Sequence, residues 1–494
     1  MDMPGRLSNV NPGTALTRPS STPDRPGILH LGLGNFHRAH QAVFTAAAME
    51  AEPGAWGIVG AANTSHRVVD PLREQDGRYT VLTLDPQGAT AEVIALHTDF
   101  LVAGEQPDAL LGTMADERIR IVTLTVTENG YSYSPRTGEL ETDSDSVVSD
   151  LAGEGPTTTI GRLARGLERR FRSNGAPLAI VSCDNLQDNG RLTQALVRRF
   201  IEVADGPDSA DVLHWLDDQV TFPSTMVDRI VPATEDTHRE QVRELTGVSD
   251  HVAVPAEPFN FWVMEDRFAG GRPAWEAGGA IFAEDVKSYE LLKLRVLNAS
   301  NSMLAYLGLL GSRAYIAESL ALRGVGEVLE KLMREEMVPT LDVPEAIDID
   351  DYIRELFERF GNRAVGHRTA QVGSDGSAKL PVRITEAVHH HMDRDGPPAA
   401  IALLVAAYIR CLANPSDAYP VEVTGAPTDP RAEDLAALGR RHTNARDLVH
   451  AVFDEAQIFT VVLSEETGFV DRVTELYSAL QRDGLDAAIR DALA

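Results

Sequence analysis

The sequence predicts an α/β protein with a doubly wound, mostly parallel sheet in its first half and a mostly α-helical second half. Up to about residue 280, short β-rich runs alternate with helix-like segments, which is typical of a parallel sheet covered by helices. From about residue 285 onward, helix-like segments follow one another and few β-rich runs remain. A chain of 494 residues is also too long for one ordinary hydrophobic core, so two domains are expected.

The β-rich runs of the first half lie at residues 28–31, 56–61, 79–84, 119–126 and 178–183. We expect these runs to be strands of the doubly wound sheet, with an Ala-rich helix at residues 38–50 after the first of them. In such sheets ligands bind beyond the carboxyl ends of the strands. This rule selects the loops at residues 32–37, 127–131 and 184–190.

The expected helices of the second half lie at residues 286–309, 317–337, 350–360, 398–412, 432–438 and 469–482. The expected organisation is a flexible N-terminal segment at residues 1–26, a dinucleotide-binding Rossmann domain at residues 27–282 and a helical substrate and catalytic domain at residues 283–494.

Composition excludes several classes of function. The formal net charge of −29 argues against binding to nucleic acid or to an anionic membrane surface. The apolar run at residues 399–409 is too short to span a bilayer and is expected to be a buried helix. Two cysteines, Cys183 and Cys411, make neither a disulfide framework nor a cysteine zinc site. With no signal peptide evident, these features predict a cytoplasmic protein.

A glycine-containing loop follows the first expected strand and opens a helix. Gly32 and Gly34 let the backbone approach a pyrophosphate, and the helix N-terminus offers amide donors to it. Asn35 and Phe36 belong to the same expected cofactor-binding loop. The third glycine of the usual dinucleotide fingerprint is replaced by His37, and an ordinary strand–helix turn is the alternative interpretation.

The residues after the second expected strand bear on the choice of cofactor. An acidic residue that would hold the ribose hydroxyls of NAD is not evident there; His66 and Arg67 follow instead. A basic residue in this place accepts the 2′-phosphate of NADP. NAD is the expected cofactor, NADP stays open, and a surface helix start is the alternative role for Arg67.

A lysine-containing segment is the most informative part of the second half. At about 100° per residue, Glu290, Lys293, Leu297 and Asn301 lie along one stripe of a helix, with Asn298 at its flank. Polar side chains among apolar ones are costly to bury unless they are paired. The wall of an active site explains them, and a boundary helix with a solvated face is the alternative.

Alcohol oxidation needs a base that takes the hydroxyl proton while hydride leaves the carbon. Lysine has a reference pKa of about 10.4, and desolvation lowers it toward neutrality. Asparagine amides then hold the reacting oxygen, as in an oxyanion hole. Glu290, one turn before Lys293, is placed to relay protons. This scheme needs no metal, and His389, His390 and His391 are expected on a solvated helix face, since consecutive residues point in different directions.

Many motifs of the chain resemble one family, the polyol-specific long-chain dehydrogenases of mannitol 2-dehydrogenase and fructuronate (mannonate) reductase. The matching motifs lie at residues 32–41, 127–131, 182–185, 222–223, 226–230, 257–259, 271–276, 289–302, 375–377 and 379–381. The resemblance covers roughly residues 25–485. It implies a Rossmann N-terminal domain, a helical C-terminal domain and a zinc-free active site.

The resemblance also implies roles for single residues. By motif position, Lys293 is the general acid–base, Asn185 and Asn298 are the paired amides on the reacting oxygen, and Glu290 is a carboxylate that gates proton exit. The positions that imply cofactor contact are Thr127 and Glu128. The positions that imply substrate contact are Asp228, Asn301, Gln371 and Lys379.

Three departures from the family pattern bear on specificity. Mannitol dehydrogenases usually have His where this chain has Asn301, which bears on a substrate hydrogen bond. Gln371 stands where some mannitol enzymes have Arg, and residues 367–371 are closer to the fructuronate-reductase pattern. The acidic cofactor pair of the family is replaced by His66 and Arg67.

The sequence therefore predicts a metal-independent NAD(P)-dependent oxidoreductase that interconverts a polyol and a ketose such as mannitol and fructose. One alternative is fructuronate reduction, with Lys379 or Arg383 holding the substrate carboxylate. A second alternative, of another class, is a dinucleotide-binding sensor without turnover. The expected partners are small polyols, ketoses or sugar acids, and the expected state is a monomer or small homo-oligomer.

Overall fold

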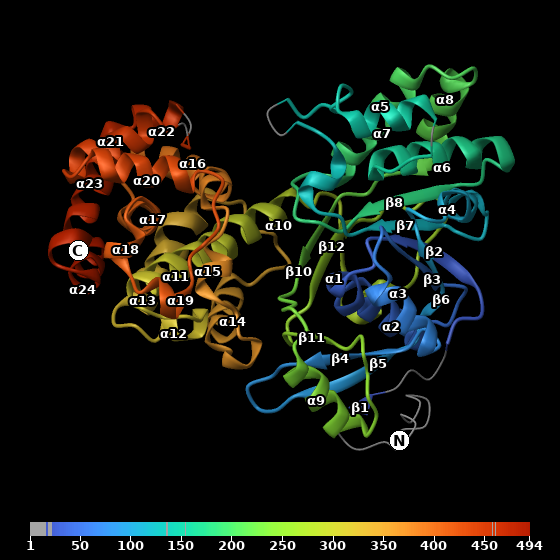
Figure 1. Ribbon diagram of the computed structural model, residues 1–494, viewed down its shortest axis with the longest axis horizontal. Coiled ribbons are helices and arrows are strands. Elements are labelled where there is room, and N and C mark those ends of the chain that lie inside the picture. Colours follow the sequence, from blue (N-terminus) through green and yellow to red (C-terminus); the bar gives the residue numbers. More distant parts are fainter. Residues whose placement is uncertain (1–15, 18–21, 135–136, 154, 457, 460) are drawn as a thin grey trace. The chain divides into compact units, whose positions relative to one another are not determined.

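The structure is a computed structural model that describes residues 16–17, 22–134, 137–153, 155–456, 458–459 and 461–494 (Figure 1). The chain divides into two compact units, Met1–Lys287 and Ser288–Ala494. Each unit has hydrophobic core clusters of its own.

In the described part of the first unit, six parallel strands form the central sheet, in the order β6-β3-β2-β7-β8-β9. Their bounds are β2 (Pro26–Leu31), β3 (Gly57–Ala62), β6 (His97–Val102), β7 (Ile121–Leu124), β8 (Leu178–Ser182) and β9 (Val220–Thr221). Counted along the chain, this order is 3-2-1-4-5-6, the order of a Rossmann fold, and it reverses between β2 and β7. The predicted fold class is confirmed.

Apolar side chains from these strands enter two separate cores. Ile28 and Ile121 point into one core, and their chain neighbours Leu29 and Val122 point into the other. A parallel sheet buried on both faces needs such continuous aliphatic runs. The helices that contribute to these cores are α1 (Asn35–Ala39), α2 (Gln41–Ala51), α3 (His66–Glu74), α4 (Pro107–Ala115), α5 (Asp145–Ala152), α6 (Thr159–Ser173), α7 (Asn189–Ala204) and α8 (Ser209–Gln219). Helix α9 (Asp236–Thr246) buries Val242 outside these two cores.

One predicted strand belongs to a different sheet. The segment at 79–84, expected in the doubly wound sheet, is β4 (Tyr79–Thr83), which pairs antiparallel with β5 (Thr90–Ile94) in a sheet ordered β1-β5-β4-β11. The expectation was wrong because a turn, with Gly88 N–H donating to the Asp85 carbonyl at 3.0 Å, returns the chain as a hairpin instead of a helical crossover.

The remaining strands of the first unit are short. In the segment expected to be flexible, β1 (Leu16–Thr17) pairs parallel with β5, while residues 1–15 and 18–21 of that segment lie outside the described residues. The third sheet has the order β10-β12-β13. The bounds not yet given are β10 (Thr225–Asp228), β11 (Val254–Ala256), β12 (Phe261–Glu265), β13 (Ile281–Ala283), η2 (Glu128–Tyr131) and η3 (Trp275–Gly278).

The second unit is helical around one core. Helix α17 (Ala399–Ala413), predicted from its apolar run, is buried along nearly its whole length. The other helices are α10 (Lys287–Leu292), η4 (Lys293–Asn298), α11 (Ala299–Leu310), α12 (Ile316–Leu320), α13 (Val325–Lys331), η5 (Leu332–Met337), η6 (Val338–Thr340), α14 (Ile349–Gly361), η7 (Arg363–Val365), α15 (Thr369–Val372), α16 (Gly376–Met392), α18 (Pro415–Ala418), α19 (Val421–Thr424), α20 (Ala432–Arg441), α21 (Ala445–Asp454), α22 (Val461–Glu465), α23 (Thr467–Arg482) and α24 (Leu485–Leu493). Apart from the helix face expected at residues 389–391, the sequence did not predict α16, and it did not predict α21 or α24; Pro381 interrupts the pattern of α16. The expectation of a solvated face was wrong for His391, which is buried with its Nε2 2.9 Å from the Glu336 carbonyl oxygen, while His389 is exposed.

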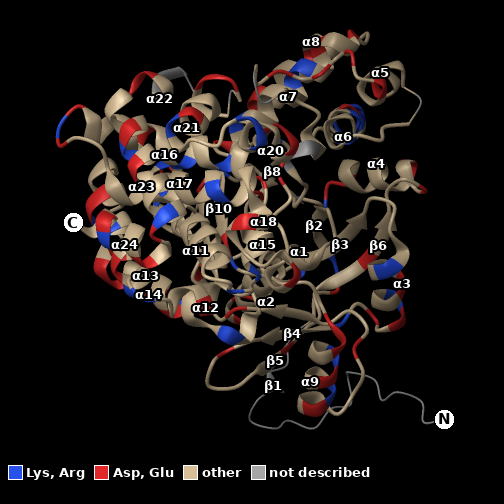
Figure 2. Ribbon diagram, turned by 60° about the vertical axis from the view of Figure 1, so that its left-hand side comes forward, with Lys and Arg blue, Asp and Glu red and all other residues tan. Residues whose placement is uncertain are grey.

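Acidic and basic residues are interspersed along the surface helices (Figure 2). On α9, for example, Arg243 pairs with Glu240 one turn earlier. Over the part of the chain that the structure describes, there is no helix with the length and apolarity to cross a membrane.

Candidate functional site

A tight turn at Gly32 leads from β2 into α1. Gly32 has a φ of 101°, and a Cβ there would lie 2.3 Å from the carbonyl oxygen of Thr125, so both backbone conformation and space require glycine. Gly34 has a φ of −107°, and a Cβ there would meet, among the described residues, only the Gly32 carbonyl oxygen at 3.6 Å. The space beside Gly34 is therefore open, which fits the close backbone approach of a dinucleotide pyrophosphate.

Two side chains contact the carbonyl oxygen of Gly32. Thr125 Oγ1 donates to the Gly32 oxygen at 2.8 Å, and His30 Nε2 lies 3.1 Å from the same oxygen. Burial lowers the pKa of His30 to about 3, so its ring is neutral and carries one proton. His30 Nε2 also lies 3.0 Å from Thr125 Oγ1, and His30 Nδ1 lies 2.8 Å from Thr123 Oγ1, so hydrogen bonds hold the ring at both nitrogens.

His37, which replaces the third glycine of the usual fingerprint, stacks on the ring of His30. Its ring centroid lies 3.4 Å from that of His30, and its Nε2 lies 3.2 Å from Nε2 of His97 at the start of β6. All three rings are buried, and desolvation lowers the pKa of each. The neutral histidine stack therefore connects the glycine turn to α1 and to β6.

The side chains of Asn35 and Phe36, in the same loop, make contacts within the protein. Asn35 Oδ1 accepts from Arg38 Nη2 at 2.7 Å, and Asn35 Nδ2 donates to Thr234 Oγ1 at 3.3 Å. Phe36 is half-buried and stacks on His40 at 4.9 Å. The helix expected at 38–50 begins earlier, at Asn35, and breaks at His40, whose Nε2 bonds to the Phe261 carbonyl at 2.9 Å.

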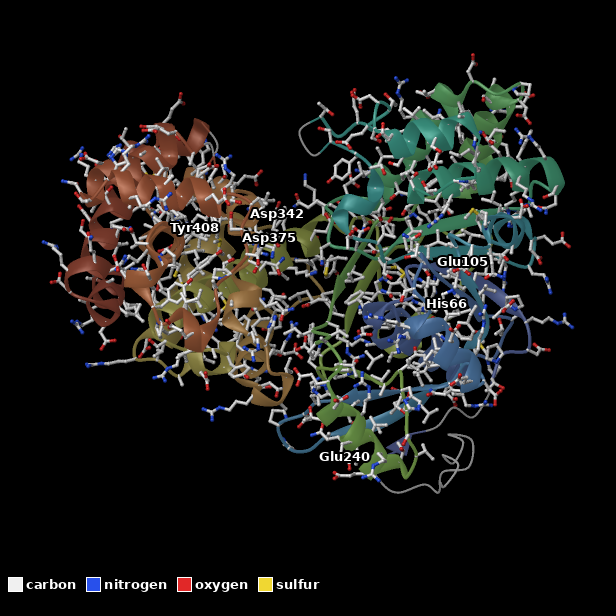
Figure 3. The ribbon with its side chains drawn as sticks, in the orientation of Figure 1. His66, Glu105, Glu240, Asp342, Asp375 and Tyr408 are labelled. Atoms are coloured by element: carbon white, nitrogen blue, oxygen red, sulfur yellow. The ribbon has the colours of Figure 1, made fainter. Side chains whose placement is uncertain are left out.

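The end of β3 carries a charged cluster. His66 lies beside Glu105 (Figure 3), with its Nε2 2.9 Å from Glu105 Oε1. His66 Nδ1 lies 3.2 Å from Asp70 Oδ1. Two hydrogen bonds raise the pKa of His66, and the one with Glu105 has a larger effect than the one with Asp70. Arg67 is exposed, and its backbone N–H donates to the Ser65 side chain that caps α3.

The loops after β7 and β8 are tied to each other by side chains. Tyr131 OH donates to Asp184 and lies 3.0 Å from Ser182 Oγ. Asp184 Oδ1 also accepts from Asn189 Nδ2 at 3.3 Å, and Asn189 in turn bonds to Thr225 on β10. These bonds fix the loop that carries Asn185, which is exposed, and the strand that ends at Asp228, which is buried.

The other residues expected at these loops are less informative. Thr127 is exposed at the N-terminal end of η2, and the side chain of Glu128 lies outside the described residues. Cys183 is buried, and burial raises the pKa of its thiol well above the ordinary value, so it is not an activated nucleophile.

In the second unit, the lysine segment is not a regular α-helix. Lys293–Asn298 form a π-helical turn between α10 and α11. A π turn closes its hydrogen bonds between residues five apart, and such turns often mark functional sites. The predicted stripe was therefore wrong in one respect. Leu297, which was expected on the same stripe as Lys293, is buried in the core. Asn298, five residues after Lys293, is the residue one π turn later.

Arg383 on α16 supports this turn. Its Nη1 donates to the carbonyl oxygen of Asn298 at 2.8 Å and to Ser302 Oγ at 2.6 Å. One turn after the π segment, Asn301 is half-buried, and its Oδ1 atom is buried with no hydrogen-bond partner among the described residues.

The remaining candidates of the second unit lie on α10, α15 and α16. Glu290 is buried near the end of α10. Gln371 is exposed on α15. Lys379 Nζ donates to the Ser374 carbonyl at 2.8 Å and lies 3.5 Å from Asp375 Oδ2.

Sequence reasoning missed Glu105, whose carboxylate comes from a loop far along the chain from His66. It named Arg383 only as a possible ligand of a substrate carboxylate, and not as the residue that reaches Asn298 from another helix. It named His37 only as the replacement of a glycine, and not as a partner of His30 and His97. Across the described ranges, His, Cys, Asp and Glu side chains form no group of three or more that could hold a metal ion.

Comparison with known proteins matches both units. Residues 26–277 match the Mannitol dehydrogenase Rossmann domain, and residues 285–481 match the Mannitol dehydrogenase C-terminal domain. The chain is 35% identical over 475 residues to oxidoreductase YdfI of Escherichia coli strain K12, covering 94% of each chain. It is 35% identical over 467 residues to D-mannonate oxidoreductase of the same strain, covering 92% of this chain and 93% of the relative.

A solved structure is similar over nearly the whole chain. It is mannitol 2-dehydrogenase of Pseudomonas fluorescens in a ternary complex with NAD and D-mannitol. The TM-score is 0.85 at 32% identity, and the match covers 99% of this chain and 98% of that one.

Proposed function

Because the chain belongs to the mannitol dehydrogenase family of oxidoreductases, we propose that it interconverts a polyol and a ketose of the mannitol–fructose type. A nicotinamide dinucleotide, when bound, accepts or supplies the hydride. The relative of known structure was solved with NAD and D-mannitol, which supports both parts of the proposal.

Lys293 is the proposed general acid–base. It takes the proton of the reacting hydroxyl in oxidation and returns it to the carbonyl oxygen in reduction. The observation that carries this role is the π-helical turn, which begins at Lys293 and ends at Asn298. A rare helix geometry in an otherwise α-helical segment is explained if the two side chains act on one group.

The amides of Asn298 and Asn185 are proposed to hold the reacting oxygen. An amide N–H donor stabilises an oxygen on which negative charge develops as the proton leaves. Each residue stands on a fixed support: Arg383 bonds to the Asn298 carbonyl, and the loop of Asn185 is held through Asp184. Glu290, buried one turn before Lys293, is the proposed relay for protons.

The proposed substrate contacts are Asp228, Asn301, Gln371 and Lys379. Asn301 Oδ1 is a buried acceptor with no partner in the described chain, and a sugar hydroxyl is the donor that would satisfy it. Asp228 is a buried carboxylate, which also suits a hydroxyl and opposes a second carboxylate. These two acceptors favour a neutral polyol.

D-Mannonate oxidation is the second candidate, since the chain is 35% identical to D-mannonate oxidoreductase. For that substrate Lys379 or Arg383 would bind the carboxylate. Both already donate to protein oxygens, at 2.8 Å to the Ser374 carbonyl and at 2.8 Å to the Asn298 carbonyl. The polyol therefore stays the preferred substrate class.

A substrate panel tests the proposal. Mannitol, arabinitol, sorbitol and mannonate are assayed for oxidation, and fructose and fructuronate for reduction, each with both nicotinamide dinucleotides. We expect the highest kcat/KM with a neutral polyol. Turnover of mannonate and fructuronate alone would select the second candidate, and cofactor binding without turnover of any compound would select a sensor.

A further inference from the structure

The loop after β6 runs beside the end of β3. Ala103 N–H donates to the Ala62 carbonyl at 2.8 Å, and Gly104 N–H donates to the Asn63 carbonyl at 2.8 Å. Gly104 is close to this segment, because a Cβ there would lie 3.3 Å from the Asn63 oxygen. The next residue, Glu105, therefore lies near the end of the second strand of the Rossmann sheet, although in sequence it follows the third strand.

In a Rossmann domain, the residues just beyond the second strand face the 2′ position of the adenosine ribose. A carboxylate there accepts the 2′-hydroxyl of NAD, whereas a basic group accepts the 2′-phosphate of NADP. The sequence places no acidic residue directly after β3, where Asn63, Thr64 and Ser65 precede His66.

Starting from the proposed nicotinamide-dependent reaction, we infer that Glu105 supplies the missing carboxylate and makes this site prefer NAD to NADP. His66 acts as the positioning residue: its Nε2 holds Glu105 Oε1 at 2.9 Å, and its Nδ1 is fixed by Asp70 at 3.2 Å. The Glu105 side chain is 62% exposed and so remains accessible to a ligand.

His66 does not serve as a phosphate ligand in this arrangement. Both of its ring nitrogens lie against carboxylates, so neither N–H is left for a 2′-phosphate. The two carboxylates raise the pKa of His66, which favours the protonated ring that pairs with them.

Arg67 is a nearby group that favours NADP. It is exposed, and it has no carboxylate partner among the described residues. A 2′-phosphate would therefore gain one guanidinium but would approach Asp70 and Glu105, whose like charge opposes it. A 2′-hydroxyl meets no such repulsion and finds an acceptor in Glu105.

Nucleotide binding tests this inference without relying on turnover. Dissociation constants of NADH and NADPH are measured by nucleotide fluorescence at one ionic strength, for the wild type, Glu105→Gln and Glu105→Arg. Glu117→Gln is the matched control, since Glu117 is an exposed carboxylate that precedes β7 and so lies toward the N-terminal ends of the parallel strands, away from their carboxyl ends. His66→Gln tests the positioning role.

We expect the wild type to bind NADH at least about tenfold more tightly than NADPH, the size of one hydrogen bond to a charged group. Glu105→Gln should remove most of that preference, Glu105→Arg should reverse it, and His66→Gln should reduce it partly. Glu117→Gln should leave it unchanged.

Two results overturn the inference while the proposed function stands: tighter NADPH binding by the wild type, or the same NADH-to-NADPH ratio in Glu105→Gln and Glu117→Gln. Failure of the wild type to bind either nucleotide would instead reject the proposed function, and the inference with it.

Discussion

Gly32→Ala and Gly34→Ala form a matched pair of substitutions in the turn after β2. At Gly32 the added methyl group would lie 2.3 Å from the Thr125 carbonyl oxygen on a backbone with a φ of 101°. An unfavourable backbone region alone costs about 1–3 kcal/mol. Relief of the clash must also move the end of β7, so we expect a total loss of about 2–4 kcal/mol in the free energy of unfolding.

Of the atoms that the structure describes, the same methyl group at Gly34 meets only the Gly32 oxygen, at 3.6 Å, on a backbone with a φ of −107°. Gly34→Ala should therefore unfold at nearly the wild-type temperature. Its effect should appear in NADH binding, because the methyl group occupies the space into which we place the pyrophosphate.

The assay is thermal unfolding of both variants with and without NADH. A loss of about 2–4 kcal/mol corresponds to a fall in Tm of roughly 3–7 °C for a unit of this size. We expect this fall for Gly32→Ala, and for Gly34→Ala a normal Tm without ligand that NADH raises less than in the wild type. Equal Tm values for the two variants, or full stabilisation of Gly34→Ala by NADH, would refute the reasoning.

Three further outcomes are expected. Arg383→Met removes the charged donor that holds the Asn298 carbonyl at 2.8 Å, so kcat should fall about tenfold or more while the Kd of NADH is unchanged. Arg383→Lys should recover part of the loss. An unaltered kcat in Arg383→Met would contradict the role of Arg383 in positioning Asn298. Burial lowers the pKa of His30 and of His97 to about 3, so the unfolded chain binds more protons below pH 6.5 and the free energy of unfolding should fall between about pH 6.5 and pH 3. Urea midpoints at several pH values measure this fall, and a His97→Phe variant with the wild-type slope would contradict it. The carboxylates beside His66 raise its pKa, so its ion pairs are complete below pH 6.5 and are lost as the pH rises through the raised pKa. NADH binding by the wild type should therefore weaken over that range. An identical pH profile of NADH binding in His66→Gln would show that His66 does not cause this weakening.

Local patterns allowed much of the fold to be predicted from the sequence. Runs such as residues 28–31 and 178–183 are mostly apolar along their length, because both faces of a parallel sheet are buried. The segment at 79–84 was assigned to the wrong sheet, since a β-rich run does not state its partner. Its hairpin pairing with β5 depends on the turn that follows.

The site shows the limit of such reasoning. Lys293 and Asn298 were identified as candidates, but a helix of about 100° per residue placed Leu297 on their stripe. The π turn corrects this by adding one residue to the turn, and tertiary contacts such as that of Arg383 accompany it. Glu105 was invisible for a related reason, because its role depends on which strands are neighbours in the sheet.

The most direct test of the account is the turnover of Lys293→Ala with the best polyol of the panel, compared with Lys287→Ala. Lys287 is an exposed lysine at the start of the same helical segment and serves as the control. We predict a fall in kcat of about 10²–10⁴-fold for Lys293→Ala, the range of general acid–base catalysis, with an unchanged Kd for NADH and partial recovery on addition of methylamine. Lys287→Ala should turn over polyol at the wild-type rate. A Lys293→Ala enzyme with a kcat within tenfold of the wild type would contradict the assignment of Lys293 as the acid–base.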